Sequence, residues 1–301
     1  MRRVLILAGP TASGKTKLAI ALAQRYDAEI VNADSRQIYR DMPIGTAAPS
    51  SEQLRAVPHH LFGFLDPAER YSAARFATDA MEAIRAIHER DKRAVVVGGT
   101  GFYLRALIGG VTLAPHYDEA LRERLTREAT MHSAEFLHGW LMRRDPERAK
   151  HVHPGDRYRV VRALEVALAQ PEGVARIESL PTLASEGIEW MLVALDVPGD
   201  VLDERIAQRT DRMLAVGFLE EAERIGVEAP AANAVGYSEA LAYLRGWSTH
   251  DELRALLARA TRRYARRQRT WFRGEAAAEW LSPDEVERAV REKLAWSAKR
   301  E

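Results

Sequence analysis

The stretch that decides the fold is Gly9-Pro10-Thr11-Ala12-Ser13-Gly14-Lys15-Thr16. It follows an apolar segment, Val4–Ala8, that is typical of a buried strand, and it leads into an amphipathic helical pattern at Lys17–Ala23. A buried strand, a glycine-rich turn and a helix start form the P-loop pattern, in which backbone N–H groups converge on a phosphate. We therefore expect this loop to bind a phosphate or diphosphate, with Lys15 as a cation and the Thr16 hydroxyl as a ligand of Mg²⁺.

The composition is that of an ordinary globular chain. It has 301 residues, 47% hydrophobic and 29% charged, which gives room for about two domains with a full core. With no cysteine, it has no disulfide framework, no thiolate nucleophile and no cysteine-based zinc site, and we expect a cytoplasmic location. No apolar run approaches the ~20 residues that cross a bilayer, so we expect no membrane association.

Apolar strands alternate with helical patterns in the first third of the chain. Strand candidates at Glu29–Asn32 and Ala94–Val97 follow the first strand, and Ala73–Arg90 between them has apolar residues at helical spacing. His59–Phe64 is a candidate for a further short strand. Near-continuous apolar strands separated by helices are typical of a parallel sheet covered on both faces. The sequence therefore predicts an α/β fold whose core is a P-loop-containing, doubly wound parallel sheet.

The middle of the chain has a different character. Residues 118–169 are rich in charged and helix-forming residues, whereas Glu189–Leu195 again has the pattern of a core strand. We therefore expect a discontinuous core, residues 1–112 plus 186–301 with a helical C-terminal part, and an inserted helical domain at residues 113–185. The expected helices are Asp118–Thr130, Ser133–Arg143 and Arg157–Ala169 in the insertion, then Gly199–Gly217, Leu219–Ile225, Ser238–Leu244, Thr249–Arg273 and one from Asp284.

Two polar side chains at the ends of predicted strands are candidates for catalysis. The strand at Ala94–Val97 ends in a glycine-rich loop that contains Thr100 and no carboxylate, so the usual Walker B aspartate is missing there. Asp34 follows the second strand. Because ligands bind outside the carboxyl ends of the strands in a doubly wound sheet, we expect Asp34, Thr100 and the P-loop to line one crevice. The alternatives are a Walker B role for Asp196, a helix-capping role for Asp34 and a turn role for Thr100.

Positive charge is concentrated near the C-terminus although the net charge is only +1. Residues 259–273 contain seven arginines and no acidic residue, a pattern typical of an anion-binding surface. Arg159 and Arg162 lie three residues apart on a predicted helix of the insertion, so they share one face and suit phosphate contacts. In both segments the alternative is a solvated face whose arginines pair with acids.

Taken in order along the chain, short sequence blocks carry a specific resemblance. After the P-loop come Asp34-Ser35-Arg36-Gln37-Ile38-Tyr39, Ile44-Gly45-Thr46-Ala47, Val97-Gly98-Gly99-Thr100-Gly101-Phe102-Tyr103, His153-Pro154-Gly155-Asp156, Arg162-Ala163-Leu164-Glu165, Ala234-Val235-Gly236-Tyr237 with Glu239, and Arg266-Arg267-Gln268-Arg269-Thr270-Trp271-Phe272-Arg273. This order resembles the tRNA dimethylallyltransferases, the IPP transferase family, along nearly the whole chain. Without cysteine, the chain resembles the bacterial type, which lacks the zinc finger of eukaryotic members.

The resemblance implies that a dimethylallyl group passes from dimethylallyl diphosphate to the exocyclic N6 amine of the adenosine immediately 3′ of the anticodon in tRNA, with release of pyrophosphate. The P-loop, Gly9 to Thr16, would hold the donor diphosphate, with Mg²⁺ at Thr16. Asp34, oriented by Thr100, would accept the amine proton, and Arg209 would stabilise the leaving group. We expect a monomer. It would bind the tRNA anticodon stem-loop through Asp34, Ser35, Arg36, Gln37, Thr100, Arg122, Tyr158, Arg159, Val160, Val161, Arg162, Arg262, Arg266, Arg269 and Arg273.

Two other functions fit part of the pattern. A small-molecule P-loop kinase shares the first motif and the sheet, and it would bind ATP rather than dimethylallyl diphosphate. An RNA-binding scaffold with a vestigial P-loop is disfavoured, because a scaffold needs neither the acid at Asp34 nor a diphosphate cradle in the same crevice.

Overall fold

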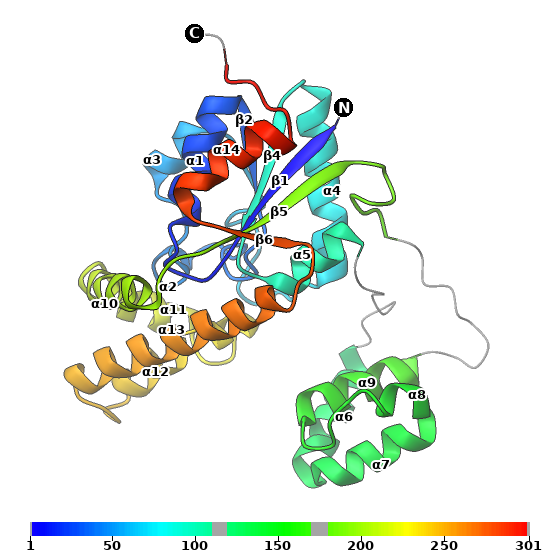
Figure 1. Ribbon diagram of the computed structural model, residues 1–301. Helices are drawn as coiled ribbons and strands as arrows, with labels where there is room; N and C mark the ends of the chain where they lie inside the picture. Colours follow the sequence, from blue (N-terminus) through cyan, green and yellow to red (C-terminus); the bar gives the residue numbers. More distant parts are fainter. Residues whose placement is uncertain (1, 110–118, 170–179, 300–301) are drawn as a thin grey trace. The chain divides into compact units, whose positions relative to one another are not determined.

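The computed structural model describes residues 2–109, 119–169 and 180–299 (Figure 1). The chain divides into two compact units: the sheet unit, Met1–Val111 with Leu180–Glu301, and the helical unit, Thr112–Ser179. The sheet unit is built on six parallel strands in the order β3-β2-β4-β1-β5-β6, so the predicted doubly wound parallel sheet is confirmed. The strands are β1 (Arg3–Ala8), β2 (Ala28–Asn32), β3 (His59–His60), β4 (Arg93–Gly98), β5 (Glu189–Leu195) and β6 (Ala278–Leu281).

Helices cover both faces of the sheet, α1 and α14 on one face and α4 and α5 on the other (Figure 1). Their bounds, in that order, are Lys15–Tyr26, Pro283–Lys293, Ala73–Glu89 and Gly101–Ile108. On the first face, the apolar side chains of α1 and α14 form one buried cluster with strand residues such as Leu5, Leu7 and Val95. Burial on both faces explains why the strands are almost continuously apolar.

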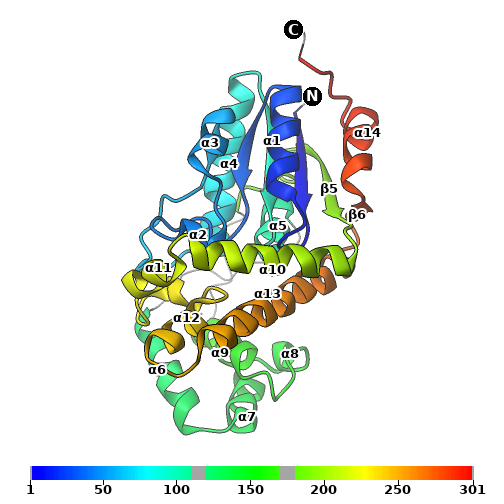
Figure 2. The same cartoon turned by 90° about the vertical axis from the view of Figure 1, so that its left-hand side faces the viewer.

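A layer of helices lies across the carboxyl ends of the strands, where α10 and α13 run side by side (Figure 2). A buried cluster that includes Met42, Phe218 and Tyr237 joins this layer to the segment between β2 and β3. The layer therefore encloses the end of the sheet at which the sequence places the site. Its bounds are α10 (Gly199–Ala215), α11 (Phe218–Ile225), η1 (Pro230–Asn233), α12 (Tyr237–Leu244) and α13 (His250–Arg273); between β2 and β3 lie α2 (Pro43–Thr46) and α3 (Ser51–Ala56).

The helical unit has a core of its own. Leu125, Leu137, Leu141, Val160 and Leu164 are fully buried at its centre. No strand occurs among its described residues, 119–169. Its helices are α6 (Glu119–Met131), α7 (Ala134–Arg144), α8 (Pro146–Ala149) and α9 (Arg157–Ala169).

Some elements differ from those expected from the sequence. Helix α5 starts within the glycine-rich loop after β4, where only a loop was expected. Strand β6 was not expected either, because it has only four residues and includes Glu279. Strand β3 comprises only His59–His60 of the predicted segment. Of the inserted domain predicted at residues 113–185, residues 113–118 and 170–179 lie outside the described part of the chain.

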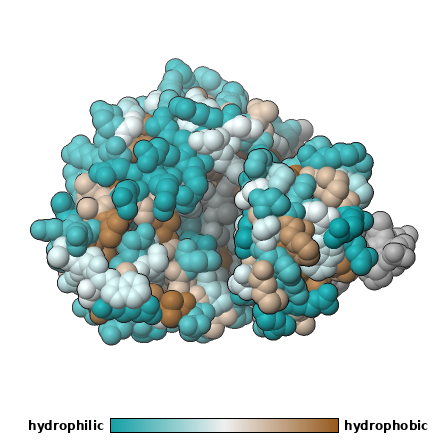
Figure 3. Space-filling model, turned by 90° about the horizontal axis from the view of Figure 1, so that it is seen from below, coloured by the Kyte–Doolittle hydropathy of each residue, from teal (hydrophilic) through white to brown (hydrophobic). Residues whose placement is uncertain are grey.

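Across the described ranges, no helix has both the length and the apolar character that crossing a membrane requires. On the face of the molecule in Figure 3, hydrophilic residues predominate and the hydrophobic patches are small and scattered. That face therefore has no extended apolar surface.

Candidate active site

A pocket of about 370 Å³ opens at the carboxyl ends of the strands. It lies where the P-loop, the loop after β2, the glycine-rich loop after β4 and helices α10 and α13 meet. Thr11, Asp34, Thr100 and Arg209 all line it, although they are far apart in the sequence. The structure thus brings one P-loop residue and all three residues with a proposed catalytic role to a single cavity.

The P-loop turns from β1 into α1 through three residues with positive φ: Gly9 (140°), Ala12 (64°) and Gly14 (90°). The Lys15 ammonium donates to the carbonyl oxygen of Pro10 at 2.7 Å, which folds the lysine back over the loop. No side chain caps the N-terminus of α1 among the described residues. Its first backbone N–H groups are therefore oriented to bind an anion.

The glycines after β4 are required by close packing. A Cβ on Gly98 would lie 2.2 Å from a backbone carbonyl of the loop after β2. A Cβ on Gly99 would lie 2.1 Å from the Gln268 amide nitrogen. A Cβ on Gly101 would lie 1.9 Å from the Trp271 indole nitrogen. Other walls of the pocket therefore occupy the space in which a Walker B carboxylate would lie.

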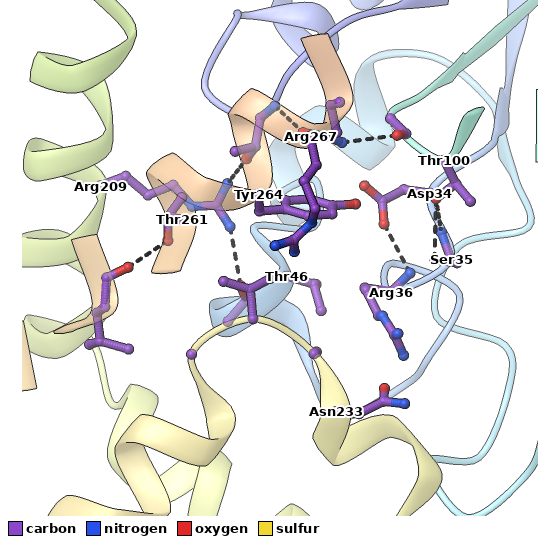
Figure 4. A pocket seen from close by; sticks show the side chains of 18 of the residues that line it. Asp34, Ser35, Arg36, Thr46, Thr100, Arg209, Asn233, Thr261, Tyr264 and Arg267 are labelled. Atoms are coloured by element: carbon purple, nitrogen blue, oxygen red, sulfur yellow. Dashed lines mark hydrogen bonds between the residues drawn. The ribbon is translucent and has the colours of Figure 1, made fainter. Parts of the chain in front are cut away.

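The Asp34 carboxylate points into the pocket beside the ring of Tyr264 (Figure 4). Its Oδ1 accepts a hydrogen bond from the Arg36 backbone N–H at 2.9 Å, so Asp34 also forms a local turn. No hydrogen bond within the described residues uses its Oδ2. Asp34 therefore combines the turn-forming role with a carboxylate oxygen that is available to a ligand.

Two side chains hold the Asp34 segment in place. Thr100 Oγ1 accepts from the Ser35 backbone N–H at 2.9 Å and donates to Ser35 Oγ at 3.2 Å, so it contacts the neighbour of Asp34 rather than the carboxylate. Asn32 is fully buried; its Oδ1 accepts from the Asp34 N–H at 2.8 Å and its Nδ2 donates to the Asp34 carbonyl at 3.1 Å. Sequence reasoning missed Asn32, although an amide at the end of an apolar strand was a usable signal.

Arg209 enters the pocket from α10 and bridges two of its walls (Figure 4). Its Nη1 donates to Thr11 Oγ1 at 2.7 Å and its Nη2 to the Gly45 carbonyl at 3.1 Å. Burial lowers the pKa of Arg209, and the Asp34 carboxylate opposes this shift. Burial also lowers the pKa of Lys15 to about 8, with Asp34 raising it and Arg209 lowering it further. Two desolvated cations thus lie near one carboxylate, an arrangement typical of a functional site.

Two buried polar atoms of the cradle, Ser13 Oγ and Arg209 Nε, have no hydrogen-bond partner among the described residues. Buried donors in folded proteins are nearly always paired. Unpaired donors in the P-loop and in the arginine that contacts it are therefore what a site for an anion with several oxygens would contain.

Many pocket residues were not predicted from the sequence, and three of them lie on α13. The side chain of Gln268 accepts from the Thr11 N–H at 2.8 Å and donates to the Gly99 carbonyl at 2.9 Å, so it joins the two glycine-rich loops. Tyr264 and Trp271 line the pocket from the same helix. Burial raises the pKa of Tyr264, and the Asp34 carboxylate adds to this effect. The signal that could have identified these residues is the presence of an amide and two aromatic side chains within the arginine-rich segment 259–273.

The other predicted residues of the sheet unit differ in position: some line the pocket, some are exposed and some are ion-paired. Ser35 and Arg36 line the pocket, whereas Gln37 donates to the backbone carbonyls of Thr46 and Ala47 at 3.1 and 3.0 Å. Two residues of α13, Arg266 and Arg273, are exposed. In contrast, Arg262 pairs with Asp203 at 3.2 Å, and Arg269 lies 3.8 Å from Asp196. Asp196, the alternative Walker B acid, is not among the residues that line this pocket.

In the helical unit, two arginines of α9 that were predicted to contact phosphate make ion pairs with acids three residues away. Arg159 lies 3.0 Å from Asp156, and Arg162 lies 2.5 Å from Glu165. Both arginine side chains remain at least 41% exposed, but the two pairs differ: Asp156 is 32% exposed, so its pair with Arg159 is solvated and weak, whereas Glu165 is only 4% exposed. The third predicted arginine of this unit, Arg122, is partly buried on α6.

The remaining predicted residues of α9 differ in exposure. Tyr158 is 74% exposed and forms part of the surface. Val161 packs partly buried against the core of the helical unit. Val160 is 0% exposed within that core, so its side chain is not accessible to RNA. The prediction that Val160 contacts tRNA is wrong for the side chain, because the apolar face of α9 points inward at this position.

Comparison with known proteins agrees with this geometry. The family model described as IPP transferase matches residues 37–275, and one described as isopentenyl transferase matches residues 2–66. The chain belongs to the IPP transferase family. It is 42% identical to the tRNA dimethylallyltransferase of Geobacter sulfurreducens, covering 93% of this chain and 91% of the relative. It is 45% identical to that of Anaeromyxobacter dehalogenans, covering 93% and 95%.

Solved structures of this family resemble the fold described above. The tRNA isopentenylpyrophosphate transferase of Bacillus halodurans has a TM-score of 0.69 at 35% identity, covering 98% of this chain and 96% of that one. A eukaryotic dimethylallyltransferase caught acting on tRNA has a TM-score of 0.80 at 26% identity, covering 100% and 82%. The resemblance found in the sequence blocks is therefore confirmed, and so is the class of enzyme: a prenyltransferase.

Proposed function

We propose that this protein transfers a dimethylallyl group from dimethylallyl diphosphate to the exocyclic N6 amine of the adenosine immediately 3′ of the anticodon in tRNA. The observation that carries the proposal is the pocket. It brings Thr11 of the P-loop and Arg209 together with a carboxylate, Asp34, whose Oδ2 is available to a ligand. A kinase of this fold would use an acid at the end of a strand beside β1; the glycine-rich loop after β4 leaves no space for one, and Asp196, which follows β5, is not among the residues that line the pocket.

The reaction breaks the bond between C1 of the dimethylallyl group and the diphosphate oxygen, and it forms a bond between C1 and N6 of adenine. The pyrophosphate leaves with the electron pair of the broken bond. Lys15, Arg209 and the N-terminal N–H groups of α1 stabilise this developing charge, because they are fixed before the substrate arrives. The N6 amine is a weak nucleophile, and Asp34 removes its proton as the new bond forms.

Mg²⁺ is the cofactor that we propose. Its preferred ligands are oxygens, and it usually keeps several waters while binding substrate phosphates and one or two protein groups. Among the described residues no cluster of three His, Asp, Glu or Cys side chains could hold a metal by itself, so substrate oxygens would complete the coordination. Thr16, at the start of α1, offers the hydroxyl. When bound, the ion neutralises part of the negative charge of pyrophosphate.

The second substrate is an anticodon stem-loop of tRNA. The target base leaves the loop stack, which costs a few kcal/mol, and phosphate contacts offset this cost. Exposed arginines of α13 and α9, such as Arg266, Arg273 and Arg159, supply those contacts. We also propose that the protein acts as a monomer and, because tRNA is the substrate, that it is cytoplasmic.

The proposal is tested by incubating the protein with Mg²⁺, dimethylallyl diphosphate and unmodified tRNA, followed by mass spectrometry of the nucleosides. We expect a five-carbon addition to one adenosine next to the anticodon. Calorimetry compares the binding of ATP with the binding of dimethylallyl diphosphate to the same protein. Tight binding of ATP, together with an unmodified tRNA, would contradict prenyl transfer and favour a kinase.

A further inference from the structure

The arginine that bridges the pocket depends on a residue that is not itself in the pocket. Arg209 has two hydrogen-bond acceptors, Thr11 Oγ1 and the Gly45 carbonyl. Thr11 belongs to the P-loop, whose path is set by β1 and α1. Gly45 lies in α2, a helix of only four residues, which has no stability of its own. The position of the Arg209 guanidinium therefore depends on what holds Gly45.

A buried carboxylate holds Gly45. Glu221 on α11 is 1% exposed. Its Oε1 accepts from the Gly45 N–H at 2.7 Å, and its Oε2 accepts from the Ile44 N–H at 2.8 Å. These N–H groups lie in the first turn of α2 and have no partner within the helix. Glu221 therefore caps α2 from a segment more than 170 residues away in the chain.

Tyr237 completes the network. Its hydroxyl, in a fully buried side chain, donates to Glu221 Oε1 at 2.7 Å. Burial and the adjacent carboxylate raise the pKa of Tyr237, so the phenol remains protonated and acts as a donor. Gly45 packs directly on this ring and on Phe218: a Cβ there would lie 2.6 Å from the Tyr237 oxygen and 2.5 Å from Phe218. Gly45 thus has no space in which to shift.

We propose that Glu221 is a positioning residue for pyrophosphate departure: it fixes Gly45, and Gly45 fixes the Arg209 guanidinium against the P-loop. The inference rests on the proposed function, in which Arg209 stabilises the leaving group. A buried carboxylate is expensive unless donors satisfy it, and here three donors do so. Glu221 therefore places a rigid acceptor for Arg209 without putting a second negative charge at the diphosphate site.

The test compares Glu221→Gln with Glu223→Gln, an exposed control on the same helix. Glutamine keeps the size of the side chain but replaces one acceptor oxygen with a donor. Loss of a charge-assisted hydrogen bond predicts about tenfold weaker binding of inorganic pyrophosphate and about tenfold lower kcat/KM for dimethylallyl diphosphate. The affinity for tRNA should stay within about twofold, because α2 and α11 carry none of the residues proposed to bind the phosphate backbone.

A double variant separates positioning from a general loss of structure. If Glu221 acts through Arg209, Glu221→Gln adds little, at most about twofold, to the loss caused by Arg209→Lys. Two results would overturn the inference. In one, the losses of pyrophosphate affinity in the two single variants multiply in the double variant. In the other, Glu221→Gln binds pyrophosphate as tightly as the Glu223→Gln control. Should Glu221→Gln fail to fold, Tyr237→Phe removes one donor only and should weaken pyrophosphate binding about threefold; an unchanged affinity would also overturn it.

Failure of the proposed function has a different signature. Wild-type protein that binds pyrophosphate but does not prenylate tRNA would refute the transfer reaction. In that case the pyrophosphate affinities of the same variants would still test whether Glu221 sets the position of Arg209.

Discussion

The pocket of the sheet unit and the surface of the helical unit hold their charged residues in different ways. Around the pocket, Arg209 is anchored by partners far away in the sequence, Lys15 and Asp34 are held within their own loops, and burial lowers the pKa of both cations. In the helical unit, Arg159 and Arg162 are exposed and pair with acids three residues away. A catalytic site requires fixed, desolvated groups. A surface that binds a polyanion requires charged side chains that can exchange a weak ion pair for a contact with phosphate. Variants in the two regions should therefore fail in different assays.

The largest effect is expected for Asp34→Ala. Loss of a positioned general base should lower the rate of prenyl transfer by about 10²–10⁴-fold. The affinity for tRNA should change little, because binding of the phosphate backbone requires no proton acceptor. Single-turnover transfer and filter binding measure the two quantities. A rate within a few-fold of wild type would remove Asp34 from the mechanism.

The sequence predicts the sheet and the side chains of the candidate site better than it predicts the hydrogen bonds that position those side chains. The P-loop letters, the apolar strands and Asp34 after β2 are local patterns, so they identify a cradle and an acid without a structure. The hydrogen bonds of Gln268 to Thr11 and of Glu221 to Gly45 join residues more than 170 positions apart. No local pattern specifies such pairings, because they depend on how α11 and α13 pack across the sheet.

Burial on a short helix is also hard to predict. In the stretch Arg157–Arg162, three arginines among a tyrosine and two valines suggest a binding face, yet the inward side of α9 is set by packing against α6 and α7. Val160 lies on that side and Tyr158 does not. Only the tertiary contacts distinguish the residues of the surface from those that form the core.

The two units should respond differently when a glycine becomes alanine. Gly98→Ala places a methyl group 2.2 Å from the backbone of the segment that carries Asp34, so we expect destabilisation of about 1–3 kcal/mol and a loss of activity. Gly139→Ala in α7 of the helical unit meets no atom within 4 Å, and it should stabilise that helix by up to about 1 kcal/mol. Thermal unfolding of both variants measures this contrast. Similar shifts in both would show that close packing does not explain the glycine-rich loop.

A pH titration tests whether Lys15 binds the diphosphate as a cation. With a pKa of about 8, the ammonium is protonated below that pH and loses its proton as the pH rises through it. Between pH 7 and pH 9 the protonated fraction falls about tenfold, so the affinity for pyrophosphate should fall by a similar factor. The Lys15→Arg variant serves as the control, because its arginine stays charged over this range. Pyrophosphate itself changes ionisation in the same way for both proteins, so only the difference between their profiles reports on Lys15. Parallel profiles for the two proteins would show that Lys15 does not titrate.

The smallest effect is expected on the helical unit, and its salt dependence is the informative quantity. Arg159→Gln should weaken tRNA binding only about threefold, because an exposed arginine first gives up its pair with Asp156. If Arg159 neutralises one phosphate, the slope of log affinity against log salt should decrease in magnitude by about 1. Lys150→Gln, an exposed cation of the same unit outside the predicted set, is the matched control. Equal changes in both variants would mean that the net charge of the unit, rather than the α9 surface, attracts the RNA.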